Sequence, residues 1–148
     1  MTPNTPGFIG PGASEILPHT LWMGGMVAFT QIPNLDLWVH CAAETEPNVP
    51  QAAKRIIWVR LDDSRDLRPD EKAAAFAAAR QAAQVVARGG RVLISCMAGV
   101  NRSGLVTGLT LKALGFTGPA AIALIRAKRG PGVLRRQEYV DLLQEQSR

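Results

Sequence analysis

Cysteine is scarce in this chain, with only Cys41 and Cys96 among its 148 residues. Two cysteines are too few for a disulfide framework, and no combination of cysteine and histidine has the spacing of a zinc site. This usage excludes the small disulfide-stapled and zinc-stabilised domain classes. It is typical of proteins kept in a reducing compartment, so we expect a cytoplasmic location.

Long apolar runs are also missing. The longest one falls well short of the roughly 20 residues that cross a bilayer, and no N-terminal segment reads as a signal peptide. Aromatic residues make up only 5% of the chain, and none alternates with basic residues as on surfaces that stack nucleic-acid bases. We therefore expect neither a membrane nor a nucleic acid as a partner.

Positive charge is present in excess, with a formal net charge of +5 and a pI of about 9.9. A basic surface suits an anionic substrate, although it is equally compatible with an ordinary solvated face. Part of this charge clusters late in the chain, at Arg126, Lys128, Arg129, Arg135 and Arg136.

Short apolar segments alternate with helix-forming ones along the chain. A strand followed by a turn is predicted at 16–25, and further strands are predicted at 35–42, 55–61 and 91–95. Helices are predicted from Pro69 to the glycines at 89–90, and over 103–114, 118–130 and 135–146. The alternation predicts an α/β fold with a central, mostly parallel sheet flanked by helices. We expect an N-terminal arm over 1–15 and a single domain over 16–148.

The segment "SCMAGVNRSG", residues 95–104, lies between a predicted strand and a predicted helix. In a parallel sheet, such a loop sits at the carboxyl ends of the strands, where ligands bind. Its backbone N–H groups can all point inward and form an anion cradle, which Gly99 helps by allowing a tight curl. Arg102 closes the loop and offers a planar fork to a tetrahedral oxyanion.

Cys96 lies at the start of this loop, on the floor of the expected cradle. The field that attracts an anion also stabilises a thiolate, which suggests nucleophilic attack on a bound phosphoryl group. The Ser103 hydroxyl can hydrogen-bond the sulfur and make it a better leaving group. A lone cysteine in such a turn is more often a small buried apolar residue. Here glycine, arginine and serine stand in the right places at once, which favours chemistry.

A phosphoryl transfer of this kind needs a proton for the leaving oxygen, and a carboxylic acid can supply it. The segment "VRLDDSRD" follows the preceding strand and offers Asp62, Asp63 and Asp66. We expect Asp63 to be the acid. Asp62 directly follows the strand and is the alternative, unless it points away or caps the turn. Asp66 is the third candidate, but its expected role is to cap the following helix, which is common for such a residue.

These segments resemble the protein tyrosine phosphatases, most closely their dual-specificity branch. The pattern of cysteine, five residues, arginine and serine is the signature of that family, and the likeness extends from Ile16 to Leu143. The segments that carry it are "LPHTLWMGG", "LDLWVHCAAE", "VRLDD", "GGRVLIS" and "IALIRAKRG…LRRQEYVDLL".

The resemblance implies a two-step mechanism without metal or cofactor. Cys96 would form a cysteinyl-phosphate while Asp63 protonates the leaving oxygen, and water would then hydrolyse the intermediate. The implied partners are a phosphorylated protein or peptide, and phosphate or sulfate-like anions in the loop. The implied phosphate-binding residues are Met97, Ala98, Gly99, Val100, Asn101 and Arg102.

The chain departs from the family pattern at several positions. Ser95 stands where the family usually has a histidine that holds the loop and tunes the thiolate. Asn101 replaces a small residue and can tie the loop to its surroundings. Arg136 occupies a position where many relatives place an asparagine that lines the site. The loop has no lysine, whereas phosphatases that prefer polyphosphoinositides have one. This absence favours phosphotyrosine and other monoesters as substrates.

The second cysteine, Cys41, follows His40 in a predicted core strand, and the position six residues after it is Pro47 rather than arginine. This pair is therefore read as part of the strand and not as a second site. Some relatives have a cysteine in this strand, so Cys41 is also a possible redox partner that traps oxidised Cys96 as a reversible disulfide.

Other functions remain open at this point. The chain keeps the cysteine, arginine and acid that a catalytically silent phosphate-binding module typically loses. Nucleotide, RNA or lipid phosphates are alternative substrates. Sulfur transfer and arsenate reduction fit less well, because of the Cys-to-Arg spacing and because the loop begins only at residue 96. No insertion that builds a deep wall is evident, so we expect a shallow site that admits phosphoserine and phosphothreonine besides phosphotyrosine.

Overall fold

Five strands form one sheet in the order β1–β2–β5–β3–β4 in the computed structural model, which describes residues 12–145. The strands are β1 (Ala13–Leu17), β2 (Leu21–Gly24), β3 (Leu35–His40), β4 (Ala53–Trp58) and β5 (Val92–Ser95). Only β1 and β2 pair antiparallel, and all other neighbouring strands are parallel. The predicted α/β fold with a mostly parallel sheet is confirmed.

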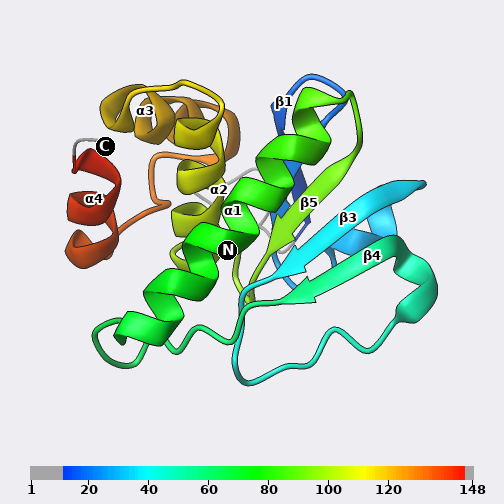
Figure 1. Cartoon of the computed structure of the whole chain (residues 1–148), viewed down its shortest axis with the longest axis horizontal. Coiled ribbons are helices and arrows are strands. Elements are labelled where there is room, and N and C mark those ends of the chain that lie inside the picture. Colours follow the sequence, from blue (N-terminus) through cyan, green and yellow to red (C-terminus); the bar gives the residue numbers. More distant parts are fainter. Residues whose placement is uncertain (1–11, 146–148) are drawn as a thin grey trace.

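Four α-helices cover one face of this sheet (Figure 1). They are α1 (Pro69–Ala87), α2 (Arg102–Ala113), α3 (Gly118–Arg129) and α4 (Gln137–Gln144). The other face carries two short 3-10 helices, η1 (Ala28–Gln31) and η2 (Pro50–Ala52). All four predicted helices therefore lie on one face of the sheet, and the two 3-10 helices on the other face were not predicted.

Successive side chains of the central strands point to opposite faces of the sheet, and each face packs into its own apolar core. Leu37 and Val39 of β3 face the α-helices together with Val92 and Ile94 of β5. The intervening Trp38 and Leu93 face the 3-10 helices with Ala28, Ile32 and Leu35. A strand buried on both faces reads as a continuous apolar run, which is why these strands were recognisable in the sequence.

Helix α2 is the most deeply buried element, since Arg102 to Leu111 are all buried. Small residues make room for its neighbours: the alanine face of α1 packs beside it, and Gly108 lies against Leu143 of α4. A helix enclosed on all sides holds its first turn rigidly. The loop before it, residues 96–101, therefore starts from β5 and ends on α2, two fixed points.

Several boundaries differ from the sequence prediction. The segment 16–25 is not one strand and turn but parts of β1 and β2, joined by a turn in which His19 adopts a φ of 63°. His19 is exposed in this turn. Strand β1 already begins at Ala13, within the range predicted as an arm. The rest of that range, residues 1–11, lies outside the described part.

Candidate active site

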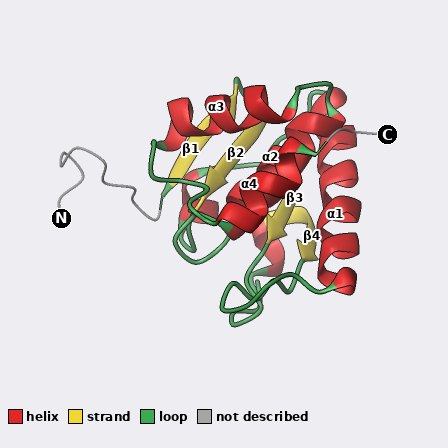
Figure 2. Cartoon of the chain, turned by 90° about the vertical axis from the view of Figure 1, so that its left-hand side faces the viewer, coloured by secondary structure: helices red, strands yellow, loops and turns green. Residues whose placement is uncertain are grey.

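The carboxyl ends of β3, β4 and β5 meet at one edge of the sheet, where the connecting loops gather (Figures 1 and 2). The loop 96–101 leaves β5 at the centre of this edge. Backbone hydrogen bonds tie it to both sides: Cys96 N donates to Gly24 O at 3.2 Å, and Leu134 N donates to Val100 O at 3.0 Å. Sheet topology alone thus places the loop where the sequence predicted a ligand site.

The backbone N–H groups of residues 97–101 donate no hydrogen bond to any described residue. Buried or half-buried amides are normally paired, so a run of free donors indicates a place for an acceptor. Gly99 has a φ of 70°, and a Cβ there would lie 2.6 Å from the carbonyl carbon of Gly24. The curl of the loop therefore needs glycine at this position.

Cys96 lies inside this curl and is 3% exposed. The Sγ atom of Cys96 is 3.1 Å from the Oγ atom of Ser103, in the first turn of α2. A hydroxyl at this distance can donate to a thiolate. The two groups that the sequence proposed as nucleophile and helper are in contact.

Arg102 is held by carboxylates at the edge of the cradle. Its Nη1 and Nη2 atoms donate to the Glu44 carboxylate at 2.5 and 2.9 Å, and Nη1 also donates to Leu61 O at 3.0 Å. Burial alone would lower the pKa of Arg102, but the bonds to Glu44 and the nearby charges of Cys96 and Asp63 raise it above its usual value. The guanidinium is therefore a permanent, oriented cation.

Glu44 was missed by the sequence analysis. Its hydrogen bond with Arg102 lowers the pKa of the carboxyl group, so the side chain is ionised at neutral pH. The available signal was a carboxylate shortly after a strand that ends at the same sheet edge as the loop. That signal is weak, because nothing local to Glu44 indicates which cation it meets.

The three candidate acids occupy different positions. Asp63 Oδ2 lies 3.5 Å from Arg102 Nε. Asp62 turns back to accept from Ser64 N at 2.9 Å and Ser64 Oγ at 2.6 Å, and these bonds lower the pKa of Asp62. Asp66 is 90% exposed and pairs with Arg136. Of the three, Asp63 is the one whose carboxylate pairs with Arg102.

A buried polar network lies under the loop where the family pattern has a histidine. Ser95 Oγ accepts from Trp38 Nε1 at 2.8 Å and lies 2.8 Å from His40 Nδ1. The hydroxyl of Ser95 can serve His40 Nδ1 either as donor or as acceptor, according to the tautomer of the ring. Burial lowers the pKa of His40 to about 4, with the charge of Arg102 acting in the same sense, so the ring is neutral at pH 7. The imidazole missing before Cys96 is thus present one strand away.

Two further side chains anchor the loop from outside. Asn101 Oδ1 accepts from the backbone N–H groups of Arg135 at 2.8 Å and Arg136 at 3.0 Å, so the asparagine ties the loop down as expected. Arg129 donates to Gly99 O at 2.7 Å and Ala98 O at 3.3 Å. The carbonyl groups of Ala98 and Gly99 are thereby paired, whereas the N–H groups of residues 97–101 have no partner among the described residues.

Cys41 directly follows β3, and its N–H donates to Ser95 O at 2.7 Å. Because His40 pairs with Ser95 in the parallel register, Cys41 and Cys96 are the next residues on adjacent chain segments, and both belong to the same core. Both are free thiols. Burial and the nearby charge of Cys96 raise the pKa of Cys41, which therefore stays protonated.

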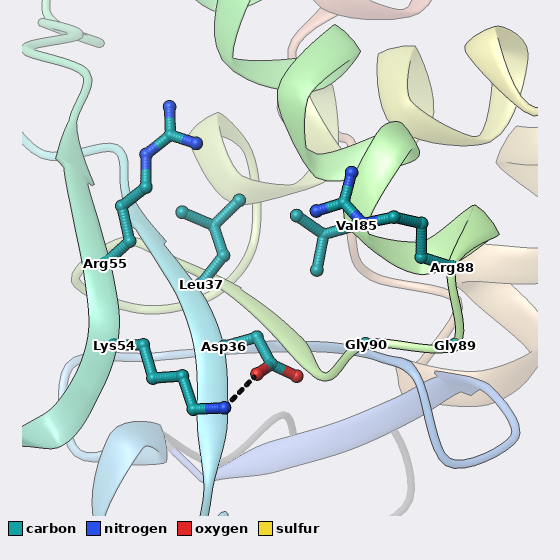
Figure 3. A pocket seen from close by; sticks show the side chains of 8 residues that line it. All are labelled: Asp36, Leu37, Lys54, Arg55, Val85, Arg88, Gly89 and Gly90. Atoms are coloured by element: carbon teal, nitrogen blue, oxygen red, sulfur yellow. Dashed lines mark ion pairs between the residues drawn. The ribbon is translucent and has the colours of Figure 1, made fainter.

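A hollow of about 480 Å³ lies at the opposite, amino-terminal end of the sheet. Figure 3 shows Leu37 and Val85 between the guanidinium groups of Arg55 and Arg88, beside an ion pair of Lys54 with Asp36. No member of the loop 96–102 lines it, so this hollow is separate from the site. Within residues 12–145 there is no cluster of three or more metal-ligating side chains. In that same part of the chain, no helix is both long and apolar enough to cross a bilayer.

The fold matches solved structures of phosphatases. Human DUSP28 has a TM-score of 0.76 at 22% identity over 92% of this chain and 93% of its own. Tk-PTP in its active form has a TM-score of 0.71 at 21% identity over 93% and 99%. The human tyrosine phosphatase-like serine/threonine/tyrosine-interacting protein has a TM-score of 0.68 at 19% identity over 90% and 94%. No protein-family model and no curated protein matched the sequence. The chain therefore has the dual-specificity phosphatase-like fold.

Proposed function

We propose that this chain is a cysteine-dependent phosphatase that hydrolyses phosphotyrosine and, through a shallow site, phosphoserine and phosphothreonine. The observation that carries the proposal is the run of free N–H groups at 97–101, curled around Cys96 and closed by Arg102. Such a cradle suits the tetrahedral, doubly charged oxygen face of a phosphate monoester. The shared fold supports the same reading.

In the first step, the Cys96 thiolate attacks phosphorus and a sulfur–phosphorus bond forms. The bond from phosphorus to the ester oxygen breaks, and the neutral carboxyl group of Asp63 donates its proton to that oxygen. The backbone N–H groups and Arg102 hold the three equatorial oxygens, where negative charge is spread in the transition state. The products are the free alcohol or phenol and a cysteinyl-phosphate.

In the second step, water attacks the phosphorus atom and gives its proton to the Asp63 carboxylate. The sulfur–phosphorus bond breaks, inorganic phosphate leaves, and Cys96 returns as a thiolate. Ser103, at 3.1 Å from the sulfur, donates a hydrogen bond to the departing thiolate and stabilises it. No metal ion or cofactor takes part in either step.

The carboxylates beside the cradle support a shallow site. Asp63 and Glu44 are 43% and 53% exposed, so no wall covers them on the solvent side. A deep site selects phosphotyrosine by reach, whereas a shallow one also brings the shorter phosphoserine to the nucleophile. Turnover of matched phosphotyrosine and phosphothreonine peptides tests this part, and strict preference for phosphotyrosine would overturn it.

Hydrolysis of p-nitrophenyl phosphate with a chelator present is the primary test. We expect the wild type to turn over and Cys96→Ser to lose activity by at least about a thousandfold, because the covalent route is closed. Trapping of radioactive phosphate on the wild type, but not on Cys96→Ser, checks the intermediate. Equal rates for the two folded proteins would contradict the mechanism.

A silent phosphate-binding module is the second candidate, since a protein named only as phosphatase-like shares this fold. Phosphopeptide binding without turnover by the folded wild type would support it. Nucleotide, RNA and lipid monoesters are separate arms of the substrate assay. A kcat/KM above that of the best phosphopeptide for any of them would move the proposal to that substrate class.

A further inference from the structure

The first turn of α4 lies against the loop 62–67 that carries Asp63. Arg136, the residue just before this helix, donates through Nη1 to the backbone carbonyl of Asp63. Its Nη2 atom lies 3.6 Å from Asp66 Oδ1, and its Nε atom lies 3.4 Å from Glu138 Oε1. The guanidinium thus neutralises two carboxylates while holding the acid loop by its main chain.

Glu138 binds the backbone of the same loop a few residues further on. Its carboxylate accepts from the backbone N–H of Leu67, at 2.9 Å from Oε2 and 3.3 Å from Oε1. Arg136 and Glu138 therefore contact the backbone at Asp63 and at Leu67, near both ends of the loop. Two main-chain anchors fix the course of a loop whatever side chains it carries.

The same turn is also joined to the cradle. Asn101 accepts from the N–H groups of Arg135 and Arg136, and Leu134 donates to Val100. The segment 134–138 consequently bonds to both loops at once. This segment therefore links the loop that carries Asp63 to the cradle and fixes their relative position.

Arg136 does not pair with the carboxylate of Asp63, although the two residues are in contact. Arg136 donates to the carbonyl oxygen of Asp63 and forms its ion pairs with Asp66 and Glu138. The Asp63 carboxylate faces Arg102 instead, on the cradle side. The bond from Arg136 to the main chain therefore holds the backbone at Asp63 and leaves its carboxylate directed toward the cradle.

We propose that Arg136 and Glu138 form a latch: a pair of positioning residues that holds Asp63 over the bound phosphate so that it can protonate the leaving oxygen. The latch rests on the proposed function. It assigns a role to a position where the sequence analysis found only a departure from the family pattern. Loss of the latch should impair proton donation and leave phosphate binding intact.

Leaving-group dependence measures this role. The variants Arg136→Ala, Glu138→Ala and Asp63→Asn are compared on p-nitrophenyl phosphate, which leaves readily, and on phenyl phosphate, whose leaving group needs the proton. We expect both latch variants to lose at least about tenfold more kcat on phenyl phosphate than on p-nitrophenyl phosphate, within the range of general acid catalysis. The KM values should stay within about threefold of wild type.

A double-mutant comparison separates positioning from general structural damage. In the Asp63→Asn background, Arg136→Ala should cause little further loss on either substrate, because the group that it positions is already gone. Arg88→Ala, which removes an arginine in the distant hollow, is the matched control for charge and should show no leaving-group dependence. A uniform loss on both substrates, or an additive loss in the double variant, would overturn the latch.

Hydrogen exchange gives a readout that does not depend on turnover. The Leu67 amide and its neighbours in 62–67 should exchange at least about tenfold faster in Arg136→Ala and Glu138→Ala, while β5 keeps its protection. Unchanged exchange in 62–67 would refute the latch even if activity falls. If instead the wild type hydrolyses no phosphate ester, the proposed function fails, and the exchange measurement still decides whether the latch holds the loop.

Discussion

The pairing of Arg102 with Glu44 shows how a charge that opposes substrate binding can still assist it. Glu44 repels a phosphate dianion, yet its two hydrogen bonds fix the plane of the guanidinium. Hydrogen bonds to charged groups contribute about 1.5–3 kcal/mol each, which exceeds the repulsion between exposed charges a few ångströms apart in high dielectric. Orientation should therefore dominate.

We expect Glu44→Ala to lower kcat/KM for p-nitrophenyl phosphate by about ten- to a hundredfold, because Arg102 loses its fixed orientation. Steady-state kinetics and the inhibition constant of vanadate provide the measurement. Glu46→Ala, a change of the same charge at an exposed neighbour, serves as control. A kcat/KM that rises in Glu44→Ala would mean that repulsion outweighs orientation.

At the residue scale, the two thiols also lead to a prediction. Adjacent parallel segments lie about 4.8 Å apart, within the span that a disulfide bridges. Peroxide should therefore convert the wild type to a form with a Cys41–Cys96 bond that dithiothreitol reverses. In Cys41→Ser the same treatment should drive Cys96 to sulfinic acid, and activity should not return. Mass spectrometry distinguishes these products, and absence of the cross-link in oxidised wild type would exclude the redox role of Cys41.

At the scale of elements, the approach of α3 to α4 depends on Gly118. A Cβ at this position would lie 2.1 Å from the backbone oxygen of Leu143, which is far too close for any side-chain adjustment to relieve. Gly118→Ala should consequently lower the free energy of unfolding by about 1–3 kcal/mol, although helix propensity alone favours alanine. Urea unfolding followed by circular dichroism measures the change. Unchanged or increased stability would show that α4 moves freely on α3.

The sequence could predict features made of residues that are neighbours in the chain, but not contacts between distant segments. Helix α1 was recognised because proline, two acids, an alanine-rich run and a glycine pair all occur in one continuous stretch. The cradle was recognised for the same reason, since its cysteine, glycine, arginine and serine are neighbours in the chain. Glu44, the His40–Ser95 contact and the latch were missed because each joins residues more than 50 positions apart. Only the folded sheet brings those partners together.

At the scale of the whole molecule, His40 makes stability depend on pH. Its pKa falls from 6.5 to about 4 on folding, so the unfolded chain binds the proton more tightly. The contribution of neutral His40 to the free energy of unfolding is therefore fully present above about pH 6.5 and is lost as the pH falls toward 4. A shift of this size corresponds to roughly 3 kcal/mol.

The matching experiment compares urea midpoints of wild type and His40→Gln between pH 7 and pH 4.5. The wild type should lose about 2–3 kcal/mol more than the variant over this interval, since glutamine does not titrate. Carboxylates with lowered pKa values that do not interact with residue 40, such as Asp36, contribute equally in both proteins and cancel in the difference. Parallel losses in the two proteins would place the acid sensitivity elsewhere.

Strand β4 closes one side of the sheet and has a single neighbour, β3. Its outer edge presents unpaired backbone groups, the kind of surface on which a second chain can add a strand and start aggregation. Lys54 and Arg55 stand exposed on this strand. A copy that tried to extend the sheet would bring like charges together, so colloidal stability should depend on these two residues. Replacing both with threonine should make the folded protein precipitate at concentrations and salt levels that the wild type tolerates.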